Sequence, residues 1–303
     1  MFEALLQMAG LILCGVIWRR LAPGGQDAKT TRTALTGLVY YLFLPALVLL
    51  VLWQAPLGGD SLRIALVAGV GVIVSLLVIG WLCRVCGLDQ GTRGAAMLAA
   101  AFPNATYLGL PVLEATFGKE GRSIAIQYDL FACTPLLLTL GTWVAVRHGI
   151  RSRAKMNWSE LLRVPALWAA VVAVVCNLLA VPFPSLLQQW LQTLANGVVP
   201  LMLISLGLSL TIKQEHFREM RSIYPVLGVK LILMPAVVLA MSTFLAMSGT
   251  LKQGVVLEAA MPSMVIGMVL CDRYGLNTAV YAAAVTVTTA VSFFTLEMWF
   301  RLA

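Results

Sequence analysis

The sequence predicts an all-α integral membrane protein with ten transmembrane helices, arranged as two inverted repeats of five helices each. The chain is 60% hydrophobic and 11% charged, whereas a soluble domain carries about 25% charged residues. Apolar stretches long enough to cross about 30 Å of hydrocarbon follow one another from end to end. In addition, a proline-containing phrase occurs twice and relates the two halves of the chain.

The predicted spans take up nearly the whole chain. They run approximately over residues 4–21, 35–53, 64–83, 94–116, 123–146, 165–181, 189–211, 222–247, 253–273 and 279–300. We therefore expect 1–147 to form the first inverted repeat, 148–164 a cytoplasmic loop, and 165–303 the second inverted repeat. No stretch is left for a soluble domain.

Basic residues fall mainly on one side of the predicted spans. They gather in the connections that follow spans 1, 3, 5, 7 and 9. The opposite side holds only Arg63, Lys119, Arg122, Lys252 and Arg301. Because positive charge stays on the cytoplasmic side, both termini are expected on the non-cytoplasmic side of an inner (plasma) membrane. This distribution also explains the net charge of +8 without a nucleic-acid partner.

The repeated phrase lies in spans 4 and 9. Ala100–Asn104 (AAFPN) returns as Ala259–Ser263 (AAMPS). A proline removes a backbone donor and clashes with the preceding helical turn, so we expect both helices to break at Pro103 and Pro262. Each half has an odd number of spans, so the two halves cross the membrane in opposite senses. Broken helices at matching positions of inverted repeats indicate a secondary transporter with its site near the membrane midplane.

The residues around the two breaks form the predicted substrate-binding site. The beginning of a half-helix carries partial positive charge and suits an anion. Asn104 adds an amide, and other side chains add hydroxyl groups. Glycines permit close approach of backbone. The predicted substrate-binding residues are Pro103, Asn104, Thr106, Tyr107, Gly109, Pro262, Ser263 and Gly267.

Three ionisable residues lie inside the predicted spans and away from the span ends: Lys230, Glu258 and Asp129. A charge there costs at least about 2.5–3.5 kcal/mol on insertion scales, so each one is a functional candidate. Lys230 and Glu258 are expected within roughly 10 Å of each other in depth and can pair. Asp129 and Glu258 lie at similar distance from the outer face and can share a proton or a cation. These three form the predicted ion-coupling or support site. The candidate coupling ions are H⁺ and Na⁺, and we expect no cofactor and no structural metal site.

Several motifs resemble those of the auxin efflux carrier family. Asn104–Pro111 (NATYLGLP) is similar to the family's Asn-x-x-x-x-Gly-x-Pro signature. Lys230–Pro235 (KLILMP) resembles the stretch from a basic residue to a proline in span 8. Ala260–Pro262 (AMP) and Tyr41–Pro45 (YLFLP) resemble spans 9 and 2. These matches occur in order over nearly the whole chain.

The resemblance implies a fold like that of the sodium/bile acid symporters. In that fold spans 1, 2, 6 and 7 form a scaffold that mediates homodimerisation, and spans 3–5 and 8–10 form a moving transport domain in which spans 4 and 9 cross. It implies an organic acid anion as cargo. By motif, Asn104 is the substrate-binding asparagine, Pro103 and Pro262 are the crossover prolines, and Lys230 is the support-site base. Span 3 lacks the acidic partner of that base, so Glu258 or Asp129 must replace it or the coupling differs.

The sequence therefore predicts a transporter and not an enzyme. It moves an organic acid anion (a carboxylate) by alternating access, and its other contacts are membrane lipid and a second copy of the chain. Two alternatives stay open. A cation/proton antiporter of similar crossed-helix fold requires adjacent carboxylates at the crossing, where this chain has Asn104 and Ser263. An anion-binding membrane sensor requires a signalling partner, because no signalling domain is attached.

Overall fold

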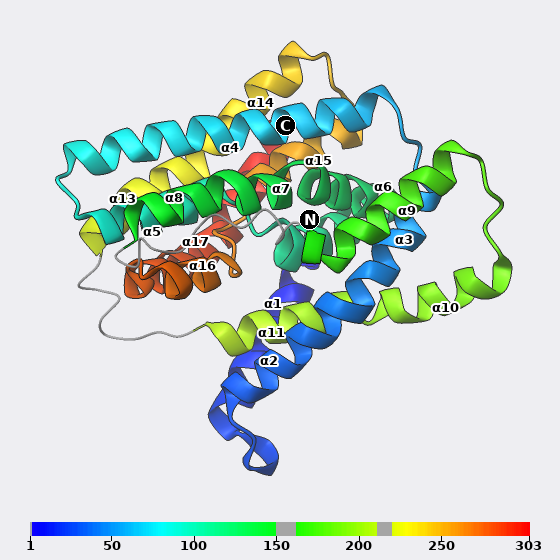
Figure 1. The fold of residues 1–303 in the computed structure, drawn as a ribbon, viewed down its shortest axis with the longest axis horizontal. Helices are drawn as coiled ribbons and strands as arrows, with labels where there is room; N and C mark the ends of the chain where they lie inside the picture. The colour runs from blue at the N-terminus through cyan, green and yellow to red at the C-terminus, as the bar shows by residue number, and fades with distance from the viewer. Residues whose placement is uncertain (1, 150–161, 211–219) are drawn as a thin grey trace. The chain divides into compact units, whose positions relative to one another are not determined.

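The protein is helical throughout the described residues of a computed structural model, which are 2–149, 162–210 and 220–303 (Figure 1). This confirms the predicted all-α class. The only β-type contact in these ranges is an isolated antiparallel bridge between Pro103 and Ser263. Most of the expected loop at 148–164 lies outside the described residues.

Within the described ranges, six helices are long and apolar enough to cross a membrane. They are Ala28–Gln54, Gly59–Val85, Ala105–His148, Ser185–Ser209, Ser222–Phe244 and Thr278–Leu302. The chain is therefore an integral membrane protein. Six is fewer than the ten spans predicted, partly because span 9 is divided into the short helices Gly249–Ala260 and Gly267–Tyr274, and span 4 begins with the short helix Gln90–Ala101. None of these three helices alone has the length of a span.

The helix counted as Ala105–His148 covers parts of two predicted spans. It contains Gly118, whose φ of 63° and ψ of −137° depart from helical geometry. A backbone with positive φ is accessible to glycine at little steric cost, so the helical path changes direction at this residue. The turn coincides with the connection expected between spans 4 and 5.

The chain divides into two compact units. Among the described residues, the first unit holds 2–62, 106–126 and 162–210. Its elements are α1 (Phe2–Leu21), η1 (Pro23–Gly25), α2 (Ala28–Leu38), η2 (Val39–Phe43), α3 (Leu44–Gln54), most of η3 (Ala105–Gly109) and of α6 (Leu110–Tyr128), α9 (Pro165–Leu178), α10 (Ser185–Asn196) and α11 (Val198–Ser209).

Close helix crossings hold the first unit together. α1 packs on α11 where Gly15 meets Gly207. A Cβ atom added to Gly15 would lie 2.2 Å from the carbonyl oxygen of Ile204, so only glycine fits. α3 packs on α9, and there the side chain of Asn177 donates hydrogen bonds to the carbonyl oxygens of Leu52, Trp53 and Ala55 at 3.2, 2.8 and 2.8 Å. These carbonyls lie at the C-terminal end of α3, where a helix leaves acceptors unpaired.

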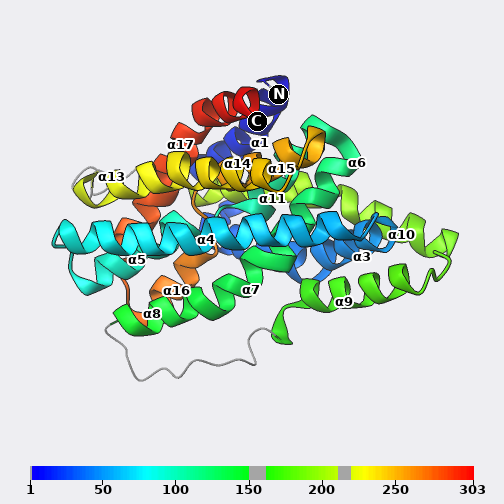
Figure 2. The ribbon, with the colours of Figure 1, turned by 90° about the horizontal axis from the view of Figure 1, so that it is seen from above.

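The second unit holds the described residues 63–105, 127–149 and 220–303. Its elements are most of α4 (Gly59–Val85), α5 (Gln90–Ala101), η4 (Asp129–Cys133), α7 (Thr134–Leu136), η5 (Leu137–Gly141), α8 (Thr142–His148), α13 (Met220–Gly228), η7 (Val229–Leu233), α14 (Met234–Phe244), α15 (Gly249–Ala260), α16 (Gly267–Tyr274) and α17 (Thr278–Leu302). α5 packs on α8 and α17, and α15 packs on α14 and α17 (Figure 2).

Two capping side chains join the beginnings of α5 and α17. The carboxylate of Asp89 accepts a hydrogen bond from the backbone N–H of Thr92 at 3.0 Å. The Asn277 side chain accepts from the N–H of Val280 at 3.2 Å and donates to the hydroxyl of Thr92 at 2.9 Å. Because a cap satisfies otherwise unpaired donors at a helix start, these contacts fix where both helices begin.

Four wide π-helical turns in the described residues precede prolines. η2 precedes Leu44-Pro45, η3 precedes Leu110-Pro111, η4 precedes Thr134-Pro135, and η7 precedes Met234-Pro235. Proline cannot donate to the carbonyl four residues earlier and crowds it, and an extra residue in the turn relieves the clash. In η7 the carbonyl oxygen of Leu231, four residues before Pro235, instead accepts a hydrogen bond from the indole N–H of Trp299 at 2.8 Å. Asp129 and Lys230 both lie on such turns.

Candidate substrate site at the paired helix breaks

Two helices of the second unit end at the repeated proline phrase. α5 ends at Ala101, and Phe102 adopts an extended conformation with φ −108° and ψ 112°. α15 ends at Ala260, and Met261 leaves the helical region with φ −58° and ψ 148°. The next helical segments begin at Ala105 and Gly267. The non-helical residues therefore include both prolines.

The two breaks pair with each other. The N–H of Asn104 donates to the carbonyl oxygen of Pro262 at 2.8 Å, and the N–H of Met264 donates to that of Phe102 at 3.0 Å. Phe102–Asn104 and Met261–Met264 are all buried. Because unpaired backbone groups are costly away from water, this short antiparallel pair makes two helix interruptions tolerable in an apolar interior.

α17 also holds the second break. The N–H of Ser263 donates to the hydroxyl oxygen of Thr288 at 3.1 Å. The hydroxyl of Tyr281 donates to the carbonyl oxygen of Met264 at 2.6 Å. A Cβ atom added to Gly267 would lie 2.0 Å from this hydroxyl oxygen, so glycine leaves the space that Tyr281 occupies. Neither Thr288 nor Tyr281 was predicted from the sequence.

In the bridge between the two breaks, Ser263 lies opposite Pro103, and the N–H of Asn104 is bonded to Pro262. The structure thus brings the backbones of Asn104 and Ser263 into the same short pair, with the two residues offset by one position.

Asn104 is completely buried, and neither its side-chain oxygen nor its side-chain nitrogen has a hydrogen-bond partner in the protein. The hydroxyl of Ser263 is likewise buried and has no partner. Leaving a buried polar group unsatisfied costs about 1–3 kcal/mol. Since both amide atoms of Asn104 are unpaired, this holds whichever way the amide is turned. Such a group at a helix break is suited to a ligand.

The other predicted substrate residues are divided between the two units. Thr106, Tyr107 and Gly109 lie on η3 within the first unit, and Tyr107 and Gly109 are buried. Pro103, Pro262, Ser263 and Gly267 lie in the second unit with Asn104.

Lys230 on η7 is completely buried in the second unit. Its ammonium group lies 2.9 Å from the carbonyl oxygen of Ala259 and 2.9 Å from the sulfur of Met234. Ala259 is in the last turn of α15, where carbonyl groups carry partial negative charge. Lys230 therefore stabilises the end of the helix that breaks at Pro262.

Glu258 and Asp129 have different surroundings. Glu258, on α15, is completely buried, and neither carboxylate oxygen accepts a hydrogen bond from the protein. Asp129, at the start of η4, accepts a hydrogen bond from the Thr134 hydroxyl at 2.9 Å. Lys230 and Asp129 both lie within electrostatic range of Glu258. Tyr128, whose buried hydroxyl has no partner, lies within the same range and was not predicted from the sequence.

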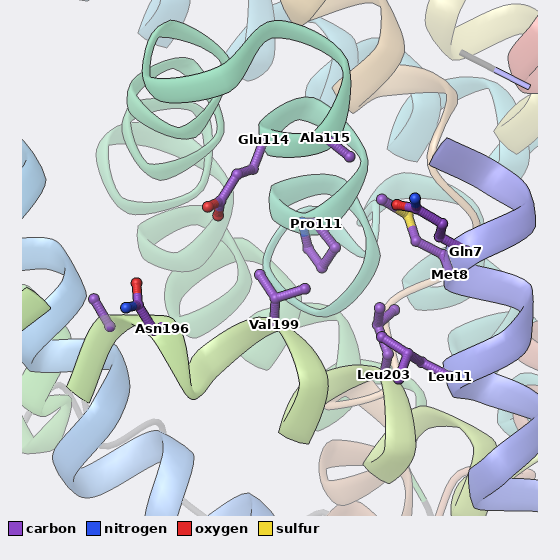
Figure 3. A pocket seen from close by; sticks show the side chains of 10 residues that line it. Gln7, Met8, Leu11, Pro111, Glu114, Ala115, Asn196, Val199 and Leu203 are labelled. Atoms are coloured by element: carbon purple, nitrogen blue, oxygen red, sulfur yellow. The ribbon is translucent and has the colours of Figure 1, made fainter. Parts of the chain in front are cut away.

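The first unit contains a separate cavity of about 400 Å³. Figure 3 shows Gln7, Met8 and Leu11 of α1 on one side, with residues of α6 and α11 on the others. The full lining is Gln7, Met8, Leu11, Pro111, Glu114, Ala115, Ala195, Asn196, Val199 and Leu203. None of the predicted site residues is among them, and Glu114 is already paired with Arg122.

The fold and the paired breaks define an integral membrane protein built like a transporter. The chain belongs to the membrane transport protein family, whose model matches residues 26–149 and 146–300. It is 30% identical to an uncharacterized transporter of Methanothermobacter thermautotrophicus over 98% of this chain and 96% of that protein. It is 23% identical to the uncharacterized transporter YfdV of Escherichia coli over 67% of this chain and 65% of that protein.

A plant relative is similar over a shorter stretch. Auxin efflux carrier component 3a of Oryza sativa subsp. japonica is 24% identical over 43% of this chain and 22% of that protein. The family match and these relatives confirm the resemblance to auxin efflux carriers that the motifs indicated.

Proposed function

We propose that the protein is a secondary transporter that carries an organic acid anion across the plasma membrane by alternating access. The observation that carries this proposal is the completely buried, unpartnered amide of Asn104 at the paired helix breaks. An amide nitrogen donates to a carboxylate, and the helical segment that begins at Ala105 adds the partial positive charge of its N-terminal end. Pro103, Pro262, Ser263 and Gly267, which lie in the same unit as Asn104, complete the proposed site. Thr106, Tyr107 and Gly109 stay a prediction from the sequence.

We propose ten spans in two inverted halves, 1–147 and 165–303. The turn at Gly118 and the two breaks support this arrangement. The unit that contains α1–α3 and α9–α11 supports a scaffold of spans 1, 2, 6 and 7, although it also takes in residues 106–126. In our proposal the scaffold dimerises, the other spans move, and both termini lie outside the cytoplasm.

Uptake by reconstituted protein tests the proposal. Purified protein in proteoliposomes is given a panel of labelled mono- and dicarboxylates, and Asn104→Ala is compared with Gln189→Ala on the exposed surface of α10. A hydrogen bond to a charged group contributes about 1.5–3 kcal/mol, so saturable uptake should fall roughly 10- to 100-fold in Asn104→Ala. It should not change in Gln189→Ala.

Two results would contradict the proposal. One is the absence of flux of any acid through tight, loaded liposomes. The other is uptake that survives unchanged in Asn104→Ala. Cation-driven proton flux without an organic acid would favour the antiporter, and ligand binding without flux would favour the sensor.

A further inference from the structure

Five polar side chains form a cluster inside the second unit, and the transport site at Asn104 does not use them. They are Tyr128, Asp129, Cys133, Lys230 and Glu258, which are between 0% and 5% exposed. They come from α6, η4, η7 and α15. Cys133 is near enough to Asp129, Glu258 and Lys230 for their charges to act on it, and Lys230 is hydrogen-bonded to Ala259, the residue after Glu258.

The cluster contains two acids and one base. If all three were ionised, a negative charge would remain in an interior where an unpaired charge is very costly. One bound proton removes that charge. Asp129 already has a hydroxyl donor in Thr134, and such a donor favours the ionised form of a carboxyl group. Glu258 has no donor to either oxygen, so the proton belongs on Glu258.

No other titratable group competes for this position on the elements packed against α15, which are α14, η7 and α17. α14 has no titratable side chain, and η7 contributes only Lys230. On α17, the hydroxyl of Tyr281 is bonded to Met264, and Glu297 pairs with Arg301. From η4 and the end of α6 come Asp129, Cys133 and Tyr128, described above.

The same geometry disfavours sodium. Transporters coordinate Na⁺ with carbonyl groups at half-helix C-terminal ends and in unwound segments. Here the ammonium group of Lys230 already donates a hydrogen bond to such a carbonyl group, that of Ala259. Ala259 is the residue after Glu258. Lys230 thus takes the place of an external cation at the end of α15.

We propose that Glu258 is a proton-binding site of this transporter and that Lys230 is its built-in counter-charge. A proton arrives from water and forms an O–H bond at a carboxyl oxygen of Glu258 while Lys230 is bonded to Ala259. When the O–H bond breaks and the proton leaves to water, the ammonium group of Lys230 turns to the carboxylate of Glu258. No redox step is involved. The part of this inference that names H⁺ as the coupled ion rests on the proposed transport function. The proton-binding site itself does not.

The cluster is connected to the substrate site through the backbone. Glu258 and Ala259 are in the last turn of α15, and Pro262 accepts the hydrogen bond from the N–H of Asn104. When Lys230 releases Ala259, it removes a contact from the end of α15 that positions this hydrogen bond. Proton release and a change at the substrate site are therefore mechanically linked.

Two measurements test the inference, one of them without transport. Infrared spectroscopy of the purified protein should show the carbonyl band of a protonated, buried carboxyl group, which Glu258→Gln lacks and the matched control Glu297→Gln retains. In proteoliposomes, a pH gradient should drive carboxylate accumulation by the wild type, and a sodium gradient should not. Glu258→Gln should lose this accumulation but retain carboxylate exchange at equal pH. Lys230→Met should also lose it.

The outcomes separate the two proposals. An infrared band assigned to Glu258 in a protein that moves no carboxylate overturns the transport function but leaves the proton site standing. Carboxylate flux with no such band overturns the proton site alone, as does pH-driven accumulation that persists in Glu258→Gln. Carboxylate accumulation that requires sodium would also overturn the proton site alone. If Glu258→Gln does not fold, Glu258→Asp takes its place: the shorter side chain should shift the carbonyl band, and an unshifted band overturns the proton site.

Discussion

The hydroxyl group of Tyr281 lies 2.6 Å from the carbonyl oxygen of Met264 and donates a hydrogen bond to it. Met264 is also one of the two residues whose N–H groups join the helix breaks. A side chain of α17 therefore fixes the shape of the non-helical segment between α15 and α16.

Tyr281→Phe should lower stability by about 1–3 kcal/mol, because the buried carbonyl of Met264 loses its donor. The thermal midpoint, followed by the loss of monodisperse protein on heating in detergent, measures the change. Tyr224→Phe, at a tyrosine that is 63% exposed, should leave the midpoint where it is. Equal thermal midpoints for Tyr281→Phe and Tyr224→Phe would show that the Tyr281 hydroxyl contributes nothing to stability.

Gly267→Ala should destabilise the same region, because the new Cβ atom would lie 2.0 Å from the hydroxyl oxygen of Tyr281. Overpacking of this kind typically costs about 1–3 kcal/mol. Gly228→Ala is the matched control, since nothing lies within 4 Å of its added Cβ atom. The thermal midpoints of the two variants should differ, and transport by Gly228→Ala should be normal.

Asn177→Ala should loosen the contact between α3 and α9. The Asn177 side chain is hydrogen-bonded to three carbonyl groups near the end of α3, and the substitution leaves them without this donor. We expect a loss of about 1–3 kcal/mol, measured as a lower thermal midpoint. Asn177→Asp keeps the size of the side chain but not its donor, so it should be at least as unstable as Asn177→Ala.

Asp89→Ala should destabilise the start of α5 by about 1 kcal/mol, the usual value of an N-cap. Hydrogen bonds from Thr92 hold the pKa of Asp89 below its usual range. This contribution is therefore complete above the unfolded pKa of about 3.9 and disappears as the pH falls through the folded value. Asp89→Asn keeps the cap without titrating, so its midpoint should depend less on acid than that of the wild type. Identical acid profiles would contradict this account.

The helical class and the positions of the breaks could be read from the sequence because both are local properties. Apolar runs give the spans, and Pro103 and Pro262 interrupt the hydrogen bonding of their own helices. The support from α17 could not be predicted, because the contacts of Thr288 and Tyr281 depend on how distant segments pack. A sequence signal was nevertheless present in the hydroxyl groups of Thr288, Thr289 and Ser292 within an apolar helix.

The cluster around Glu258 was found in part. Its charged members stood out because they lie in apolar stretches, and their order along the spans gave their approximate depth. Depth does not determine the direction in which a side chain points. Pairing of Lys230 with a carboxylate was therefore a reasonable expectation, whereas in the structure the ammonium group bonds to the backbone of Ala259.

The hydrogen bonds that join Asn104 to Pro262 and Met264 to Phe102 connect segments that are made far apart in time during synthesis. The first break is translated long before its partner and has no backbone partner until residue 264 has been made. At about 5–20 residues per second, that interval is on the order of ten seconds. During this time the nascent chain carries an unsatisfied interruption in a membrane helix. Until the second half of the chain arrives, the N–H of Asn104 and the carbonyl oxygen of Phe102 lack the partners that they have in the folded protein.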